Sequence, residues 1–231
     1  MARQFNGSSQ YLYNNSFGPF PASISCWFYV DADGGAETLV NLSELSGSGD
    51  DVRLVASMDI TNDPLRFISS DGTNENIAVA TGTITTGTWH HAWGTIDSNS
   101  YTRARFNGGG LGASFVYSRT LTLGNSRIAV RETGSLADYF GGRIAEVAIW
   151  NTDIHWDYGI DLANGASPFD IEVNNLAAYW PVWGDASPEP DLISGYDMTL
   201  SNAPTQVAHP SARYPVRTMF AAPDLSGIIT V

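Results

Sequence analysis

The sequence predicts an all-β protein, a sandwich of two antiparallel sheets with one short helix. Apolar and polar residues alternate in short runs, which is the side-chain period of a β-strand. The 23 glycines and the scattered clusters of Ser, Thr, Asn and Asp indicate many tight turns. The length of 231 residues and the hydrophobic fraction of 43% supply enough apolar material for one large sandwich.

The strand pattern is clearest in the run from Ile24 to Val30. Ile24, Cys26 and Phe28 fall on one face and Trp27 on the other, as expected for a strand inside a sandwich. The dipeptide at 71–72, Asp-Gly, is typical of a hairpin turn. The same alternation predicts strands over residues 38–42, 52–58, 65–69, 89–97, 102–106, 126–130, 142–150, 176–182 and 198–200.

The hydrophobic period becomes helical between Asp153 and Ala163, and this segment is the expected short helix. Thr152 is a suitable N-cap because its hydroxyl can accept a hydrogen bond from the first turn. Gly165 is suited to the C-terminal end of the helix, and Pro168 follows it.

The C-terminal segment has a different composition, with four prolines after residue 203 and no strand or helix period. We therefore expect two parts: a sandwich domain over residues 1–205 and an extended arm over residues 206–231. The arm contains residue types that are enriched in the cores of protein interfaces. Its predicted partner-binding residues are Arg213, Tyr214, Arg217, Met219 and Phe220.

Several motifs resemble those of the laminin-G-like, concanavalin A-like lectin/glucanase superfamily. They occur in the order and spacing of the family at residues 5–12, 24–30, 89–97, 105–108 and 142–151. The resemblance implies a concanavalin A-like jelly-roll fold. The sequence departs from the pattern at Ala145, where the family often has Asp, so a role of that carboxylate in calcium binding is in doubt. Residues 178–191 also resemble laminin-G-like proteins encoded by tailed bacteriophages.

The net charge of −13 and the absence of lysine limit the possible partners. An acidic surface repels nucleic acid and anionic membranes, so we expect neither as a partner. All 11 basic residues are Arg, which indicates fixed, hydrogen-bonded pairs or the compositional drift of a genome. The single cysteine, Cys26, reads as a small core residue. The N-terminus lacks the apolar core of a signal peptide, so synthesis in a cytoplasm is expected, with no membrane insertion.

The sequence gives little support for an enzyme. A glucanase on this fold needs carboxylates that alternate along one strand, whereas the Glu-x-Asp at Glu189 and Asp191 lies between prolines. His90 and His91 are adjacent, so on a strand they point to opposite faces and cannot share one metal ion. His155 and His209 stand alone in the sequence. We therefore predict that the protein is not an enzyme and has no catalytic residues.

Two kinds of ligand site remain open. Calcium could bind to oxygen atoms of the turns at 49–51 (Gly-Asp-Asp) and 97–99 (Asp-Ser-Asn), but with 24 acids in the chain such clusters arise easily, and solvated turns are the favoured interpretation. No other cofactor is expected. A sugar would stack on an exposed aromatic ring, for which Tyr101 and Trp156 are the candidates.

Two functions compete on this evidence, and the first is favoured by the missing signal peptide, the absence of disulfides, the acidic lysine-free composition and the phage-like ending. One is a surface protein of a phage virion, a capsid decoration or accessory structural protein that assembles in the host cytoplasm and contacts other virion proteins and copies of itself. The other is a carbohydrate-binding module of an adhesin or a phage receptor-binding protein, with glycans as partners. A glucanase is a distant third.

Overall fold

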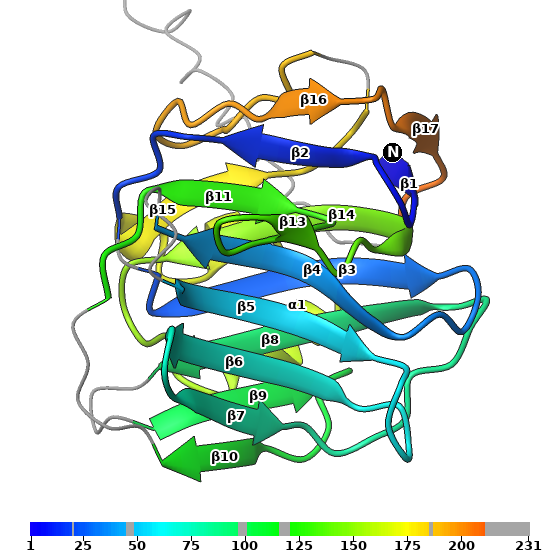
Figure 1. The fold of residues 1–231 in the computed structure, drawn as a ribbon. Coiled ribbons are helices and arrows are strands. Elements are labelled where there is room, and N and C mark those ends of the chain that lie inside the picture. The colour runs from blue at the N-terminus through cyan, green and yellow to red at the C-terminus, as the bar shows by residue number, and fades with distance from the viewer. Residues whose placement is uncertain (20, 45–48, 97–100, 116–120, 185–186, 211–231) are drawn as a thin grey trace, which may run out of the picture.

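The computed structural model describes residues 1–19, 21–44, 49–96, 101–115, 121–184 and 187–210. Two antiparallel sheets stack face to face, and Figure 1 shows the smaller sheet in front of the larger one. The expected all-β class, a sandwich of two antiparallel sheets with one short helix, is confirmed. None of the helices in the described ranges is long and apolar enough to cross a membrane.

In the described residues the larger sheet has eight strands in the order β10-β9-β8-β3-β14-β1-β17, and β15 pairs with the second half of β14. Every pair in this sheet is antiparallel. Its strands are β1 (Ala2–Asn6), β3 (Ser23–Val30), β8 (Trp89–Ile96), β9 (Tyr101–Phe106), β10 (Gly112–Phe115), β14 (Gly141–Trp150), β15 (Leu176–Trp180) and β17 (Thr205–Val207).

The smaller sheet has seven strands in the described residues, in the order β16-β2-β11-β4-β5-β6-β7. They are β2 (Tyr11–Asn14), β4 (Ala36–Ser43), β5 (Asp50–Ser57), β6 (Leu65–Asp71), β7 (Glu75–Val79), β11 (Asn125–Ile128) and β16 (Thr199–Ser201). A short hairpin of β12 (Arg131–Glu132) and β13 (Leu136–Ala137) lies beside β4.

The main core fills the space between the two sheets. Alternate residues of each strand point inward, so Phe28, Leu54, Phe67 and Ile144 are buried together. Cys26 is fully buried in the same core, and its burial raises the pKa of the thiol far above the ordinary value. The prediction that Cys26 is a core residue is therefore confirmed.

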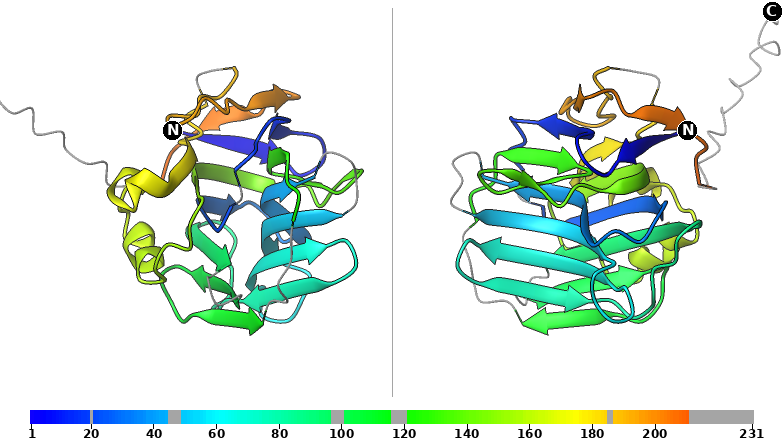
Figure 2. Two further views of the ribbon diagram at one scale, coloured as in Figure 1. Left: turned by 90° about the vertical axis from the view of Figure 1, so that its left-hand side faces the viewer. Right: turned by 45° about the vertical axis from the view of Figure 1, so that its right-hand side comes forward.

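A second core covers the outer face of the larger sheet. Helix α1 (Tyr158–Ala163) and the 3-10 turns η1 (Pro168–Asp170) and η2 (Val173–Asn175) lie on this face, as Figure 2 shows in its edge-on view. The buried members of this cluster are Trp93, Ala148, Trp150, Ile154, Leu162, Ile171, Leu176 and Tyr179. The part of the outer face around Trp93 and Trp150 is thus covered by the protein itself.

The short helix is present but begins at Tyr158, later than Asp153, where we expected it. Residues 152–154 are held instead by β3. The Ser23 hydroxyl donates to the carbonyl of Thr152 at 2.9 Å, and the amide of Ile154 donates to the Ser23 oxygen at 3.1 Å. Thr152 therefore does not cap the helix. The N-cap position is Asp157, without a side-chain capping bond.

The predicted boundary at residue 205 falls inside a strand. β17 pairs with β1 through Ala2 opposite Val207, and Pro210 is buried. Farther along, Nε2 of His209 lies 2.7 Å from Oε1 of the buried Glu146. The first residues of the arm thus belong to the larger sheet. The predicted partner-binding residues Arg213, Tyr214, Arg217, Met219 and Phe220 lie outside the described residues.

Candidate functional site

An aromatic and guanidinium cluster lies where β9 approaches the segment after β14. The Cζ atom of Arg103 is 5.1 Å from the centre of the Tyr101 ring and 5.5 Å from the centre of the Trp156 ring. The His155 ring stacks on Trp156 with 4.1 Å between centroids and 34° between planes. Trp156 is 42% exposed, a large fraction for so large an apolar ring. We call Tyr101, Arg103, His155 and Trp156 the aromatic platform.

Local structure explains why these side chains meet. Tyr101 and Arg103 are two residues apart on β9, so they project from the same face of the strand. Trp156 is carried to them by the turn that Ser23 anchors through Thr152 and Ile154. The platform offers ring faces for stacking and a guanidinium group for donating hydrogen bonds. Such a set binds polar ligands with apolar faces, which is the chemistry of a sugar.

The sequence identified only half of this platform. The structure brings the predicted stacking residues Tyr101 and Trp156 together through Arg103, and sequence reasoning missed both Arg103 and His155. The spacing of Arg103 from Tyr101 along a strand was an available signal. The sequence carries no signal that Trp156 lies near these residues, because its position depends on a turn that is hydrogen-bonded to β3.

The adjacent histidines point to opposite faces of β8, as expected. His90 contacts the main core, with Nε2 2.9 Å from the Thr85 carbonyl and Nδ1 3.0 Å from the Asn107 amide. Its burial lowers its pKa. His91 is 1% exposed on the other face, with its ring centroid 5.3 Å from that of Trp27. Burial lowers the pKa of His91 to about 3, so it is neutral at physiological pH.

The two carboxylates of the Glu-x-Asp pair make hydrogen bonds that hold parts of the fold together. Glu189 is fully buried and accepts a 2.7 Å bond from Nε of Arg3. Asp191 accepts from the backbone amides of residues 179, 193, 194 and 196 and so organises the loop after β15. Both carboxylates are thus committed to the folded chain rather than held ready across a cleft.

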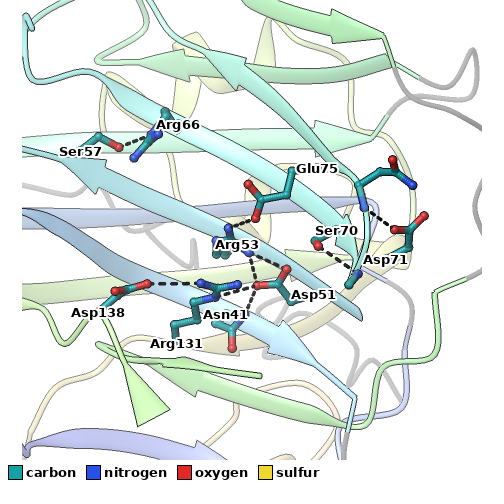
Figure 3. Close-up of polar contacts among 12 residues, drawn as sticks. Asn41, Asp51, Arg53, Ser57, Arg66, Ser70, Asp71, Glu75, Arg131 and Asp138 are labelled. Atoms are coloured by element: carbon teal, nitrogen blue, oxygen red, sulfur yellow. Dashed lines mark hydrogen bonds and ion pairs between the residues drawn. The ribbon is translucent and has the colours of Figure 1, made fainter. Parts of the chain in front are cut away.

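One of the calcium candidates takes part in a network of ion pairs on the outer face of the smaller sheet. Asp51 is fully buried between Arg53, whose Nη1 donates to Oδ1 at 2.6 Å, and Arg131, whose Nε is 3.6 Å from Oδ2 (Figure 3). Asn41 donates to the same carboxylate at 3.2 Å, and Arg53 also pairs with Glu75 at 2.5 Å. Burial raises the pKa of Asp51, while the two arginines oppose that rise. Asp51 is therefore already neutralised by protein cations.

The other acids of the calcium hypothesis do not complete a site in the described residues. Oδ2 of Asp50 accepts a 3.0 Å bond from the amide of Thr122. No group of three or more His, Cys, Asp or Glu side chains in the described ranges is placed to hold a metal ion. The turn at 97–99 lies outside those ranges, and calcium binding there stays a prediction.

We compared the sequence and the fold of this chain with those of known proteins. The family model of the concanavalin A-like lectin/glucanases superfamily matches residues 6–157. This chain belongs to that superfamily. A comparison with curated protein sequences gives no match.

Solved structures with this fold are distant in sequence. A Bacteroides ovatus protein provisionally described as carbohydrate binding is 17% identical, with a TM-score of 0.59 over 90% of this chain and 62% of that one. A heptameric SAP-like pentraxin from Limulus polyphemus is 10% identical, with a TM-score of 0.56 over 70% and 81%. The CBM40 domain of a Ruminococcus gnavus sialidase, solved with sialyllactose, is 12% identical, with a TM-score of 0.55 over 71% and 98%. These likenesses concern the fold.

Proposed function

We propose that this protein is a non-catalytic carbohydrate-binding domain and that the aromatic platform is its sugar site. The observation that carries the proposal is the meeting of Tyr101, Arg103 and Trp156 at the surface, with Trp156 42% exposed. A sugar presents an apolar C–H face to a ring and hydroxyls to a guanidinium group. The CBM40 domain and the Bacteroides ovatus protein, both named for carbohydrate binding, support a binding role for this fold.

The absence of catalysis is part of this proposal. A glycosidase needs two carboxylates about 5 to 9 Å apart across the scissile bond, one of them available as an acid. The Glu-x-Asp carboxylates, Glu189 and Asp191, are held by Arg3 and by backbone amides. We therefore expect incubation with β-glucans to release no reducing sugar above a buffer blank. Release that grows with protein concentration would overturn this part.

A glycan array and a titration of its best ligand test the sugar site. Trp156→Ala removes the exposed ring, and we expect affinity for the best glycan to fall roughly tenfold, the equivalent of about 1.4 kcal/mol. Tyr139→Ala is the matched control, because Tyr139 is a partly exposed tyrosine of the β13–β14 connection. If no glycan shows saturable binding, or if both variants bind as the unmodified chain does, the platform is not a sugar site.

A location on a virion surface is the narrower proposal. It is supported by the acidic, lysine-free composition and by the resemblance of residues 178–191 to phage-encoded proteins. In this setting the partners are other virion proteins and copies of itself. Mass spectrometry of particles purified from the source organism tests it, and absence of this chain from intact particles would end the proposal while leaving the sugar site untouched.

A further inference from the structure

A hollow with polar side chains in a largely apolar lining opens at the rim of the sandwich, and it shares no lining residue with the platform. Its volume is about 490 Å³, within the range of small-molecule sites. Its walls come from β1, the loop after β3, the start of β4 and the start of β14. The side chains that matter below are Gln4, Asn6, Asp31 and Glu37.

Glu37 is the buried acceptor of this hollow. Its side chain belongs to a residue only 8% exposed, and Oε2 accepts a 3.1 Å bond from the amide of Gly141. The other oxygen, Oε1, has no hydrogen-bond partner within the described part of the chain. A Cβ atom at position 34 would lie 2.6 Å from Oε1, so Gly34 leaves the space beside that oxygen open. Oε1 faces the hollow and can accept a hydrogen bond from a donor bound there.

The charged side chains around Glu37 are mostly negative. Asp31 and Asp33, from the loop after β3, both act on the carboxylate and raise its pKa. The nearby cation is Arg143, but its guanidinium lies 4.2 Å from the centre of the Tyr29 ring and 3.9 Å from Asp31. Arg143 thus shares its charge with Asp31 instead of approaching Glu37.

The neutral polar groups of the hollow are already committed. Gln4 donates to Asp31 and accepts a 3.1 Å bond from Arg143. The oxygen of Asn6 accepts from the backbone amides of residues 8, 9 and 10, which form the turn into β2. Glu37 is therefore the mostly buried acceptor of the hollow, and the more exposed carboxylate of Asp31 lies in the same lining. Burial is the main cause that raises the pKa of Glu37 to about 7, so its charge depends on pH near neutrality.

We propose that this hollow binds the primary ammonium group of a small organic cation, with Oε1 of Glu37 as its principal acceptor. An ammonium group supplies both the missing donor and the missing positive charge, whereas a neutral hydroxyl supplies only the donor. A multivalent metal ion fits less well, because no cluster of three or more ligating side chains is found in the described ranges. This site is separate from the aromatic platform and does not depend on the proposed sugar binding.

Titration calorimetry with 1,5-diaminopentane and with 1,5-pentanediol tests the proposal. Aliphatic ammonium groups have a pKa near about 10.4, so the diamine stays charged at both pH 8 and pH 5.5. We expect saturable binding of the diamine at pH 8 and binding at least about tenfold weaker at pH 5.5, where Glu37 is mostly protonated. The diol, equal in length but uncharged, should not bind.

Variants assign the binding to Glu37. Glu37→Gln should weaken diamine binding at pH 8 at least about tenfold, and Gly34→Ala should do the same by filling the space beside Oε1 without changing charge. Asp170→Asn, at an exposed acid near α1, is the control for overall charge. The proposal is overturned if the diol binds as tightly as the diamine, or if Asp170→Asn weakens diamine binding as much as Glu37→Gln does. It is also overturned if Glu37→Gln and Gly34→Ala both bind the diamine as the unmodified chain does. Trp156→Ala should leave the site unaffected, so a failed sugar site is distinguished from a failed ammonium site.

Discussion

His91 should make the protein sensitive to acid, because the folded state holds this imidazole neutral. Its side chain is fully enclosed on the outer face of β8, beside Trp27, and Nδ1 has no hydrogen-bond partner among the described residues. Burial lowers its pKa from 6.5 to about 3. The unfolded chain therefore takes up a proton at a higher pH than the folded chain does. The contribution of His91 to stability is fully present above pH 6.5 and is lost as the pH falls toward 3.

The size of this effect follows from the two pKa values. Each unit between them corresponds to about 1.36 kcal/mol, so the unfolded state gains about 3 kcal/mol at pH 4 and between 4 and 5 kcal/mol near pH 3. Single domains are stable by about 5 to 15 kcal/mol, which makes this one side chain a large share of the total. His91→Leu removes the titrating group and should remove the loss.

Urea denaturation at pH 7.5 and at pH 4 measures the prediction. The free energy of unfolding should fall between the two pH values by about 3 kcal/mol more in the unmodified chain than in His91→Leu, whatever the variant costs at pH 7.5. His155→Leu is the control, because that histidine has a half-exposed side chain in the aromatic platform. An equal fall in His91→Leu and the unmodified chain would refute a neutral, buried His91.

Further predictions concern Glu37 and the C-terminal segment. Because the folded pKa of Glu37 is raised from 4.5 to about 7, its ionisation should lower stability by about 3 kcal/mol between pH 4.5 and pH 8, and Glu37→Gln should be the more stable form at pH 8 in thermal melts. Deleting 211–231 removes none of the described residues and is the reference truncation. Deleting 206–231 removes most of β17 and the contact of His209 with buried Glu146, and should lower the melting temperature by roughly 3 to 10 °C; equal melting of the two truncations would contradict this.

The sequence predicted the sheets well because side-chain alternation is a local signal. The strand over 24–30 is β3 with one extra residue, and the strand over 142–150 is β14 with one extra residue. Motifs in family order then fixed how the strands are arranged, which alternation alone cannot do. The short strand β10 was missed because its Gly-Ala-Ser-Phe run carries almost no apolar alternation.

The sites were less predictable because they depend on distant partners. Glu37 reads as an ordinary polar residue of a strand, yet its environment comes from the Gly141 amide, the Gly34 turn and Asp31, which only the fold brings together. Asp51 looked like a solvated turn or a calcium ligand. Asp51 instead forms ion pairs with two arginines, one of them from the β12–β13 hairpin. No local sequence pattern predicts that hairpin.

The layout of the fold explains why both proposed sites lie at strand ends. Around Trp93 and Trp150, the outer face of the larger sheet is covered by the second core. The outer face of the smaller sheet carries the ion pairs around Asp51, where unpairing a buried charge costs several kcal/mol. A ligand on either of these covered parts would disturb groups that hold the fold, whereas the aromatic platform lies on the outer face of the larger sheet beside them, at the start of β9. Loops and strand ends are free of that constraint, and binding residues gather there on a rigid scaffold. Tyr101 at the first position of β9 and Glu37 at the second position of β4 both meet this condition.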